Sequence, residues 1–169
     1  MEELKGNHKT ESIKKLKELA EGIDICMFCT QLDVLPISAR PMSANEVDDE
    51  GNIWFVSNAR SNKNFEIKKD DKVQLFFSKI SDSQYLSVFG TASIYTNQQI
   101  IDEHWEPMAK AWFQDGKDDP DVSIIKVSPS YAYYWDTKDG KAISILKWAA
   151  RAVTGANIDD GGIEGQIKV

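Results

Sequence analysis

Apolar and polar positions alternate over much of the chain and predict a series of short β-strands. Five runs of this kind occupy residues 25–30, 35–44, 52–57, 72–78 and 85–95. Two further runs, 122–127 and 131–135, are separated by Pro129, and a last strand is expected at 142–146, before a short helix ending at Val153. Short polar turns join most neighbours, which favours antiparallel pairing over a parallel sheet with crossover helices.

Helical periodicity appears in three places. A first helix is expected over 11–21, capped by Thr10 and ended by Gly22. A short helix at 61–69 begins with Ser61 as its cap. A longer amphipathic helix is expected over 97–113, with a capping box at Thr96-x-x-Gln99 and a kink at Pro107.

These elements predict a mainly β (α+β) fold, an antiparallel sheet closed into a small barrel and decorated by helices. The 169 residues correspond to about one domain. We expect a flexible N-terminus at 1–10, one domain over 11–155 and a disordered tail over 156–169.

Charge narrows the set of partners. The formal net charge is −7, which argues against nucleic acid and against anionic membranes. No apolar stretch approaches the ~18 residues of a spanning helix. The polar N-terminus lacks a signal sequence, so a cytoplasmic location is expected.

The two cysteines, Cys26 and Cys29, form a C-x-x-C string inside a predicted buried strand. Residues i and i+3 of a strand point to opposite faces, so we interpret both as core residues rather than a redox pair. The two histidines, His8 and His104, are too far apart to suggest a zinc site beside them.

Two segments could bind an anion. Arg40 lies in the string Ser-Ala-Arg-Pro-Met-Ser, where Pro41 requires an edge strand or a break. It is either a surface residue or a guanidinium aimed at a phosphate. Ser61 and Lys63 lie where a strand ends and a helix begins, and the N–H groups of a helix start attract anions.

Other chemistry is not suggested by motifs. The sequence has no GxxxxGK[ST], no GxGxxG and no GxSxG. The late aromatic cluster from Tyr131 to Trp135 fits core packing, although a tryptophan at a strand end can also wall a planar ligand. Trp105, Trp112 and Phe113 are interpreted as helix packing. A phosphate cradle without a nucleophile, base or metal suggests a cofactor that supplies its own chemistry.

In combination these segments resemble the flavin-binding split-barrel family related to pyridoxamine 5′-phosphate oxidase, and within it the general stress protein branch. The resemblance rests on residues 38–42, 53–57, 61–63, 112–120 and 134–136. It implies a six-stranded antiparallel split barrel, a homodimer, and FMN in clefts at the dimer interface, with FAD as the alternative cofactor.

The resemblance also implies roles for single residues. Arg40, Ser61 and Lys63 would hold the FMN phosphate, and Asn62 stands where the oxidases often have arginine. Met42 and the backbone of Phe55, Val56 and Ser57 would line the flavin. Trp135, from the partner subunit, would contact the ring.

Two departures argue against oxidation of pyridoxamine phosphate itself. The helix over 97–113 offers only Lys110 for a second phosphate, and the Arg-x-His pair expected after Trp135 is missing. Two functions remain open. One is an FMN-dependent oxidoreductase that acts on a small molecule with NAD(P)H as donor. The other is a non-catalytic flavin-binding stress protein, a carrier or sensor.

Overall fold

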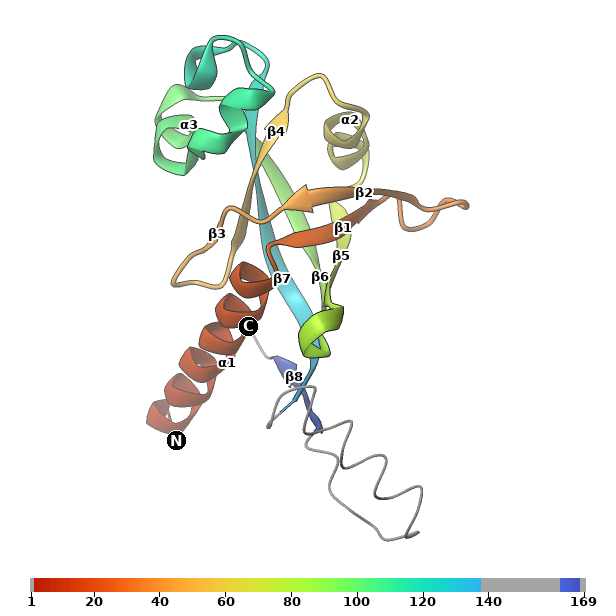
Figure 1. Ribbon diagram of the computed structural model, residues 1–169, viewed down its shortest axis with the longest axis vertical. Coiled ribbons are helices and arrows are strands. Elements are labelled where there is room, and N and C mark those ends of the chain that lie inside the picture. The colour runs from red at the N-terminus through yellow and green to blue at the C-terminus, as the bar shows by residue number, and fades with distance from the viewer. Residues whose placement is uncertain (1, 138–161, 168–169) are drawn as a thin grey trace, which may run out of the picture.

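An antiparallel sheet of eight strands forms the body of the protein in a computed structural model, which describes residues 2–137 and 162–167 (Figure 1). The strands are β1 (Ile25–Thr30), β2 (Ser38–Ser43), β3 (Glu46–Val47), β4 (Ile53–Asn58), β5 (Lys72–Lys79), β6 (Gln84–Tyr95), β7 (Val122–Thr137) and β8 (Gly162–Ile167). Their order is β2-β1-β5-β6-β7-β4-β3, with β8 added to β7. The sheet curls into a half-barrel, which confirms the mainly β, antiparallel fold class. Six of the strands match the expected barrel, and β3 and β8 are additional.

Helices surround this sheet. The α-helices are α1 (Glu2–Ile23), α2 (Asn62–Lys69) and α3 (Gln98–His104), and the 3₁₀ turns are η1 (Ile80–Asp82), η2 (Pro107–Ala111) and η3 (Gly116–Asp118). Around the end of β4, α2 lies on one side and the segment from α3 to η3 on the other (Figure 1). In the part of the chain that is described, no helix is both long and apolar enough to cross a membrane.

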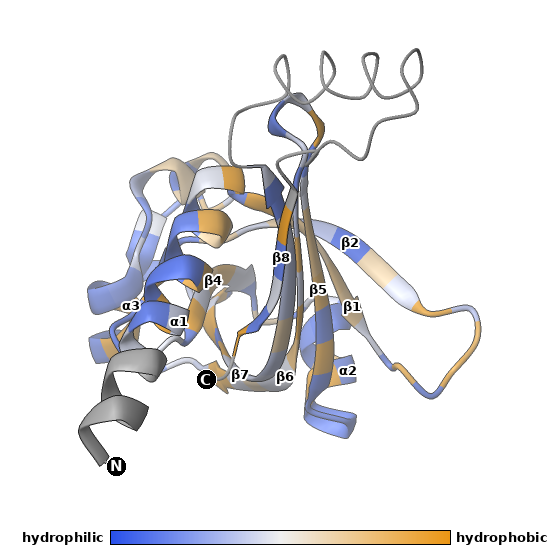
Figure 2. Cartoon of the chain, turned by 90° about the horizontal axis from the view of Figure 1, so that it is seen from below, coloured by the Kyte–Doolittle hydropathy of each residue, from blue (hydrophilic) through white to orange (hydrophobic). Residues whose placement is uncertain are grey.

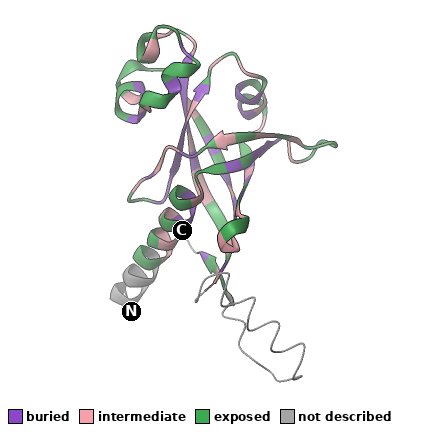
Figure 3. Ribbon diagram, in the orientation of Figure 1, coloured by how far each residue is buried: buried purple, intermediate pink, exposed green. Residues whose placement is uncertain are grey.

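The core lies between α1 and the inner face of the sheet, where alternate strand positions are apolar (Figure 2). Leu16, Leu19 and Ala20 of α1 are buried there. Phe28 of β1 and Phe55 of β4 meet edge to face, with ring centroids 5.3 Å apart. Buried positions follow the strands, whereas helix surfaces and connections are exposed (Figure 3). A second, smaller cluster packs α3 and η2 on β4 and β7.

Two helix predictions are wrong in detail. The first helix begins at Glu2, so the predicted cap Thr10 lies inside it. The helix expected over 97–113 is broken rather than kinked: α3 ends at His104, and a separate 3₁₀ turn starts at Pro107, because proline lacks the N–H that would continue the α-helical ladder. The cap of α3 is Asn97, without a side-chain hydrogen bond, instead of the predicted capping box.

The two late strands are one continuous strand, β7, which passes through Pro129. The register between β6 and β7 shifts at this point: Phe89 pairs with Tyr131 and Gly90 pairs with Pro129, so Ser130 of β7 is the extra residue of a β-bulge. A Cβ added to Gly90 would lie 2.3 Å from the Ser128 carbonyl oxygen, so only glycine allows this approach.

The C-terminal segment differs from the expected disordered tail. Gly162–Ile167 form β8, which pairs antiparallel with the end of β7. The strand predicted at 142–146 and the helix after it lie outside the described residues.

Candidate functional site

A cavity of about 830 Å³ opens where the ends of β2 and β4 meet the start of α2, η2 and the junction between α1 and β1. Its volume falls within the ~300–1,000 Å³ typical of small-molecule sites. The polar or charged lining includes Glu21, Asp24, Ser57, Asn58, Lys63 and Glu106, and the large apolar lining includes Met42, Val56, Met108, Trp112 and Phe113. We refer to this cavity as the pocket.

Lys63 supplies the positive charge of the pocket. It is only 8% exposed, and its ammonium donates to the hydroxyls of Ser57 and, at 3.1 Å, Ser61. No ion pair joins it to a carboxylate of the described chain, although buried charges are usually paired. Burial, aided by the nearby Arg40 charge and opposed by Glu66, lowers the pKa of Lys63 to about 8. A buried ammonium without a counter-charge indicates an anion site.

The start of α2 adds further donors beside Lys63. Ser61 is the N-cap, as predicted, and its hydroxyl accepts from the Asn64 N–H at 3.4 Å. Asn64 is itself held by the hydroxyls of Ser57 and Ser123, each at 2.8 Å. This buried network fixes the first turn, in which the N–H groups of residues 62 and 63 have no acceptor within the helix. The helix dipole adds partial positive charge.

Arg40 lies close to this site but does not line the pocket. Its guanidinium donates to the Thr30 hydroxyl at 2.6 Å, the Phe28 carbonyl at 3.3 Å and the Glu66 carboxylate at 2.8 Å. Burial alone would raise the pKa of the Glu66 carboxyl, but hydrogen bonds from Thr30 and Arg40 hold that pKa below its ordinary value. Arg40 is thus neither a free surface residue nor a free phosphate ligand within this chain.

The other predicted site residues divide into two groups. Met42, Val56, Ser57 and Lys63 line the pocket together. The Phe55 side chain is fully buried in the core, Ser61 acts through Lys63 and Asn64, and Asn62 is exposed at the start of α2.

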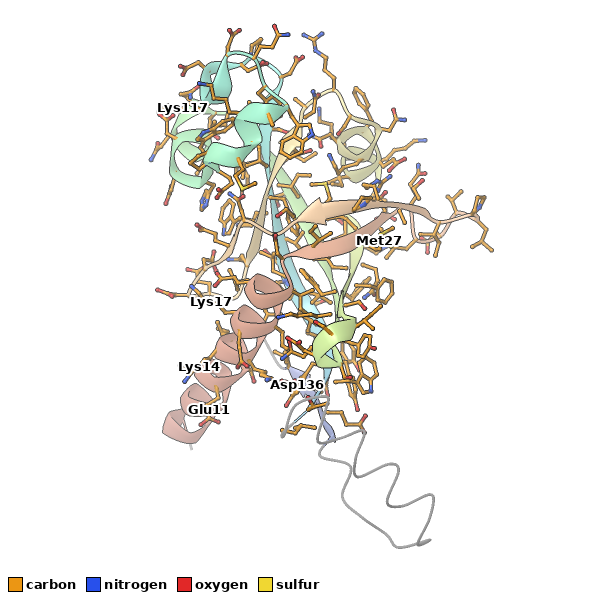
Figure 4. The ribbon with its side chains drawn as sticks, in the orientation of Figure 1. Glu11, Lys14, Lys17, Met27, Lys117 and Asp136 are labelled. Carbon is orange, nitrogen blue, oxygen red and sulfur yellow. The ribbon has the colours of Figure 1, made fainter. Side chains whose placement is uncertain are left out.

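Trp135 lies at the opposite end of the sheet. The pocket residue Asn58 pairs with Val122 at the start of β7, whereas Trp135 pairs with Tyr85 near the other end of that strand. At ~3.3 Å per residue the two ends are about 40 Å apart. In Figure 4, Lys117, beyond the pocket segment, and Asp136, next to Trp135, lie toward opposite ends of the molecule. Trp135 therefore cannot contact the pocket of its own chain.

Sequence reasoning missed several residues of the pocket. Trp112 is 77% exposed, so it does not pack the helix against the core as expected, and Met108 is 75% exposed. Glu21, Asp24 and Glu106 come from the end of α1, the turn before β1 and the break after α3. For Glu106, Met108 and Trp112 the signal was Pro107, because a proline that ends a helix turns the next residues in a new direction.

The cysteines and the acidic residues offer no alternative centre. Cys26 and Cys29 are buried in β1, and burial raises the pKa of the Cys26 thiol to about 12. The residues that the structure describes contain no group of three or more His, Cys, Asp or Glu side chains able to hold a metal ion.

A sequence profile described as "Pyridoxamine 5′-phosphate oxidase like" matches residues 11–159. The chain belongs to this family. It is 33% identical to Protein bli-3 of Neurospora crassa over 90 residues, 48% of this chain and 43% of that protein. It is 28% identical to General stress protein 26 of Bacillus subtilis over 80 residues, 46% of this chain and 56% of that protein. The matched regions thus span about half the length of these relatives.

Solved structures share the fold. A protein of Jannaschia sp. described as a putative general stress protein 26 covers 95% of this chain and 99% of its own, with a TM-score of 0.75 and 23% identity. A Xanthomonas citri structure described as a general stress FMN/FAD binding protein covers 74% of this chain and 87% of its own, with a TM-score of 0.63 and 25% identity. The resemblance to the general stress protein branch is confirmed.

Proposed function

We propose that the pocket binds FMN and that the protein is an FMN-dependent oxidoreductase of the general stress protein type. The observation that carries this proposal is Lys63, a buried ammonium that donates to hydroxyls and forms no ion pair with a carboxylate of the described residues. A dianionic phosphate at this position would supply that charge. The description of the Xanthomonas citri relative as FMN/FAD binding supports a flavin.

The residues present fit such a ligand. Lys63 and the N–H groups of residues 62 and 63 in the first turn of α2 would hold the phosphate, because charge-assisted hydrogen bonds are the strong ones. Arg40 would contribute at longer range, since Glu66 already neutralises it. Met42 and Val56 would pack against the ring system. The flavin ring supplies the redox chemistry, accepting and returning an electron pair, while the protein positions it and limits its access to water.

A second copy of the chain completes the site in this proposal. The outward face of the sheet carries exposed apolar side chains, namely Ile25, Met27, Phe76, Tyr131 and Trp135. Met27 pairs directly with Phe76 across β1 and β5, and we refer to the five exposed side chains together as the apolar patch. Burying this patch in a homodimer would bring Trp135 of one copy to the pocket of the other, which it cannot reach within its own chain.

The alternative is a flavin carrier or sensor without turnover. It is favoured by one observation: no histidine, cysteine or tyrosine lines the pocket in the part of the chain that is described. Hydride transfer to a flavin depends more on positioning than on a side-chain base, so the oxidoreductase remains the main proposal.

Two measurements test these functions. First, the purified protein with FMN added in excess and then desalted should keep the visible absorption of bound flavin. Second, NADH or NADPH added under anaerobic conditions should bleach that absorption, and air should restore it through many cycles per site. Retained flavin without repeated turnover would support the carrier. Loss of all flavin on desalting would contradict both functions.

A further inference from the structure

The pocket is charged oppositely at its two ends. Lys63 lies where β4 and α2 meet, whereas Glu21 and Asp24 lie at the junction of α1 with β1 and Glu106 lies before η2. None of these three carboxylates forms an ion pair with Lys63. Asp24 contacts Ser43, three residues along β2 from Arg40, and the Arg40 charge acts on Lys63, so at ~3.3 Å per residue Asp24 lies about 10 Å along β2 from the Arg40 position.

These carboxylates keep most of their charge available to the pocket. Asp24 accepts a hydrogen bond from the Ser43 hydroxyl, which is neutral. Glu21 accepts from the Val47 N–H at 3.0 Å, and among the described residues it is paired only with Lys17, at 3.8 Å on the helix surface. The Glu106 carboxylate has no hydrogen bond or ion pair within the described residues, while its backbone carbonyl accepts from the Ala109 N–H. Three carboxylates thus face one ammonium, and an FMN phosphate beside Lys63 would make the pocket still more negative.

Large apolar side chains stand beside the carboxylates. Trp112 and Met108 line the pocket and are 77% and 75% exposed. Glu106 precedes them along the same segment. An exposed tryptophan offers its ring face to a planar ligand, and that face attracts cations. Carboxylates and an indole at one opening form the kind of surface that recognises organic cations.

We propose that the end of the pocket away from Lys63 binds an organic cation with a planar ring, held by Trp112 and by the carboxylates of Glu21, Asp24 and Glu106. This substrate class rests on the proposed function, because the cation would lie beside a flavin anchored at Lys63. Substrates with a phosphate or carboxylate at this end are disfavoured by the same charges.

Three probes that share the same pyridine ring but differ in charge test the proposal. These are 1-methylnicotinamide, which is a cation, nicotinamide, which is neutral, and nicotinate, which is an anion. Equilibrium dialysis against the full chain loaded with FMN gives the dissociation constant of each. We expect the cation to bind about tenfold or more tightly than the anion, with the neutral ring between them. Equal binding of all three, or tightest binding of nicotinate, would overturn the proposal.

Matched variants assign the effect to the pocket. Glu106→Gln removes a charge but keeps the side-chain shape, and should reduce the ratio of cation to anion affinity about threefold. Glu103→Gln makes the same charge change at an exposed position of α3 outside the pocket lining and should leave the ratio unchanged. Trp112→Leu should weaken the cation about three- to tenfold. Equal effects of Glu106→Gln and Glu103→Gln, or no effect of Trp112→Leu, would contradict the assigned site.

The FMN titration that precedes these measurements separates the two proposals. If FMN does not bind, the proposed function fails, whatever the probes do. If FMN binds and the cation shows no preference, only the substrate class fails.

Discussion

Replacing Lys63 by methionine removes a buried charge while keeping an unbranched side chain of similar length. In the free protein this charge costs stability, because burial lowers the pKa of Lys63 from 10.5 to about 8. In the complex with FMN the same charge would contribute affinity. The substitution should therefore affect the free protein and the complex in opposite directions.

Both magnitudes can be estimated. A pKa lowered from 10.5 to about 8 corresponds to about 3 kcal/mol, at ~1.4 kcal/mol per unit. Lys63→Met should increase the free energy of unfolding of the FMN-free protein by up to about that amount at pH 7. Hydrogen bonds to a charged group contribute roughly 1.5–3 kcal/mol, so FMN affinity should fall about ten- to a hundredfold. Riboflavin affinity should hardly change, because riboflavin has no phosphate.

Urea denaturation of the FMN-free protein and quenching of flavin fluorescence measure the two effects. Lys69→Met is the control, since Lys69 lies exposed at the end of the same helix and should change neither value by more than about 0.5 kcal/mol. A Lys63→Met protein that is less stable than wild type and binds both flavins more weakly would show that Lys63 supports the fold. That result would refute the anion site.

Three further predictions follow from specific contacts. Above pH 8 the affinity for FMN should fall by about tenfold per pH unit, because a bound phosphate raises the pKa of Lys63 from about 8 and FMN binding then takes up a proton. An FMN affinity that does not change with pH, like that of riboflavin, would contradict this prediction. Gly90→Ala should lower the free energy of unfolding by more than about 2 kcal/mol, since its Cβ would lie 2.3 Å from the Ser128 carbonyl oxygen. The control Gly22→Ala, whose Cβ would have nothing within 4 Å, should not destabilise the protein. Equal effects of the two substitutions in chemical denaturation would refute the steric reason. Sedimentation should give about twice the 19.0 kDa chain mass, and Trp135→Ala should weaken both self-association and FMN binding; a monomer with full FMN affinity would exclude the shared site.

Local chemistry made much of the fold predictable from the sequence. Strand β1 and the helix capped by Ser61 have the predicted positions, because alternation and capping are short-range signals. The continuity of β7 was not predictable from Pro129 alone. It depends on the bulge at Ser130 and on Gly90 of β6, whose missing side chain leaves room for the backbone of Ser128 and Pro129.

The candidate site also contains some residues that local sequence patterns predict and others that depend on the tertiary structure. Ser61 and Lys63 were predicted because a strand end followed by a capped helix is a local pattern, whereas Ser57 was implied by the family resemblance. The pairing of Arg40 with Glu66 was not predictable, since it depends on the approach of α2 to β1 and β2. Trp112 was assigned to the core because the pattern continued a helix that Pro107 in fact ends.

The affinity of the wild-type protein for FMN relative to riboflavin tests the central claim most directly. The two flavins share the ring and the sugar chain and differ only in the phosphate that Lys63 and the start of α2 are proposed to bind. Titration of one protein sample with each flavin, followed by fluorescence quenching, should show FMN bound at least about tenfold more tightly. Equal affinities for FMN and riboflavin would contradict the account.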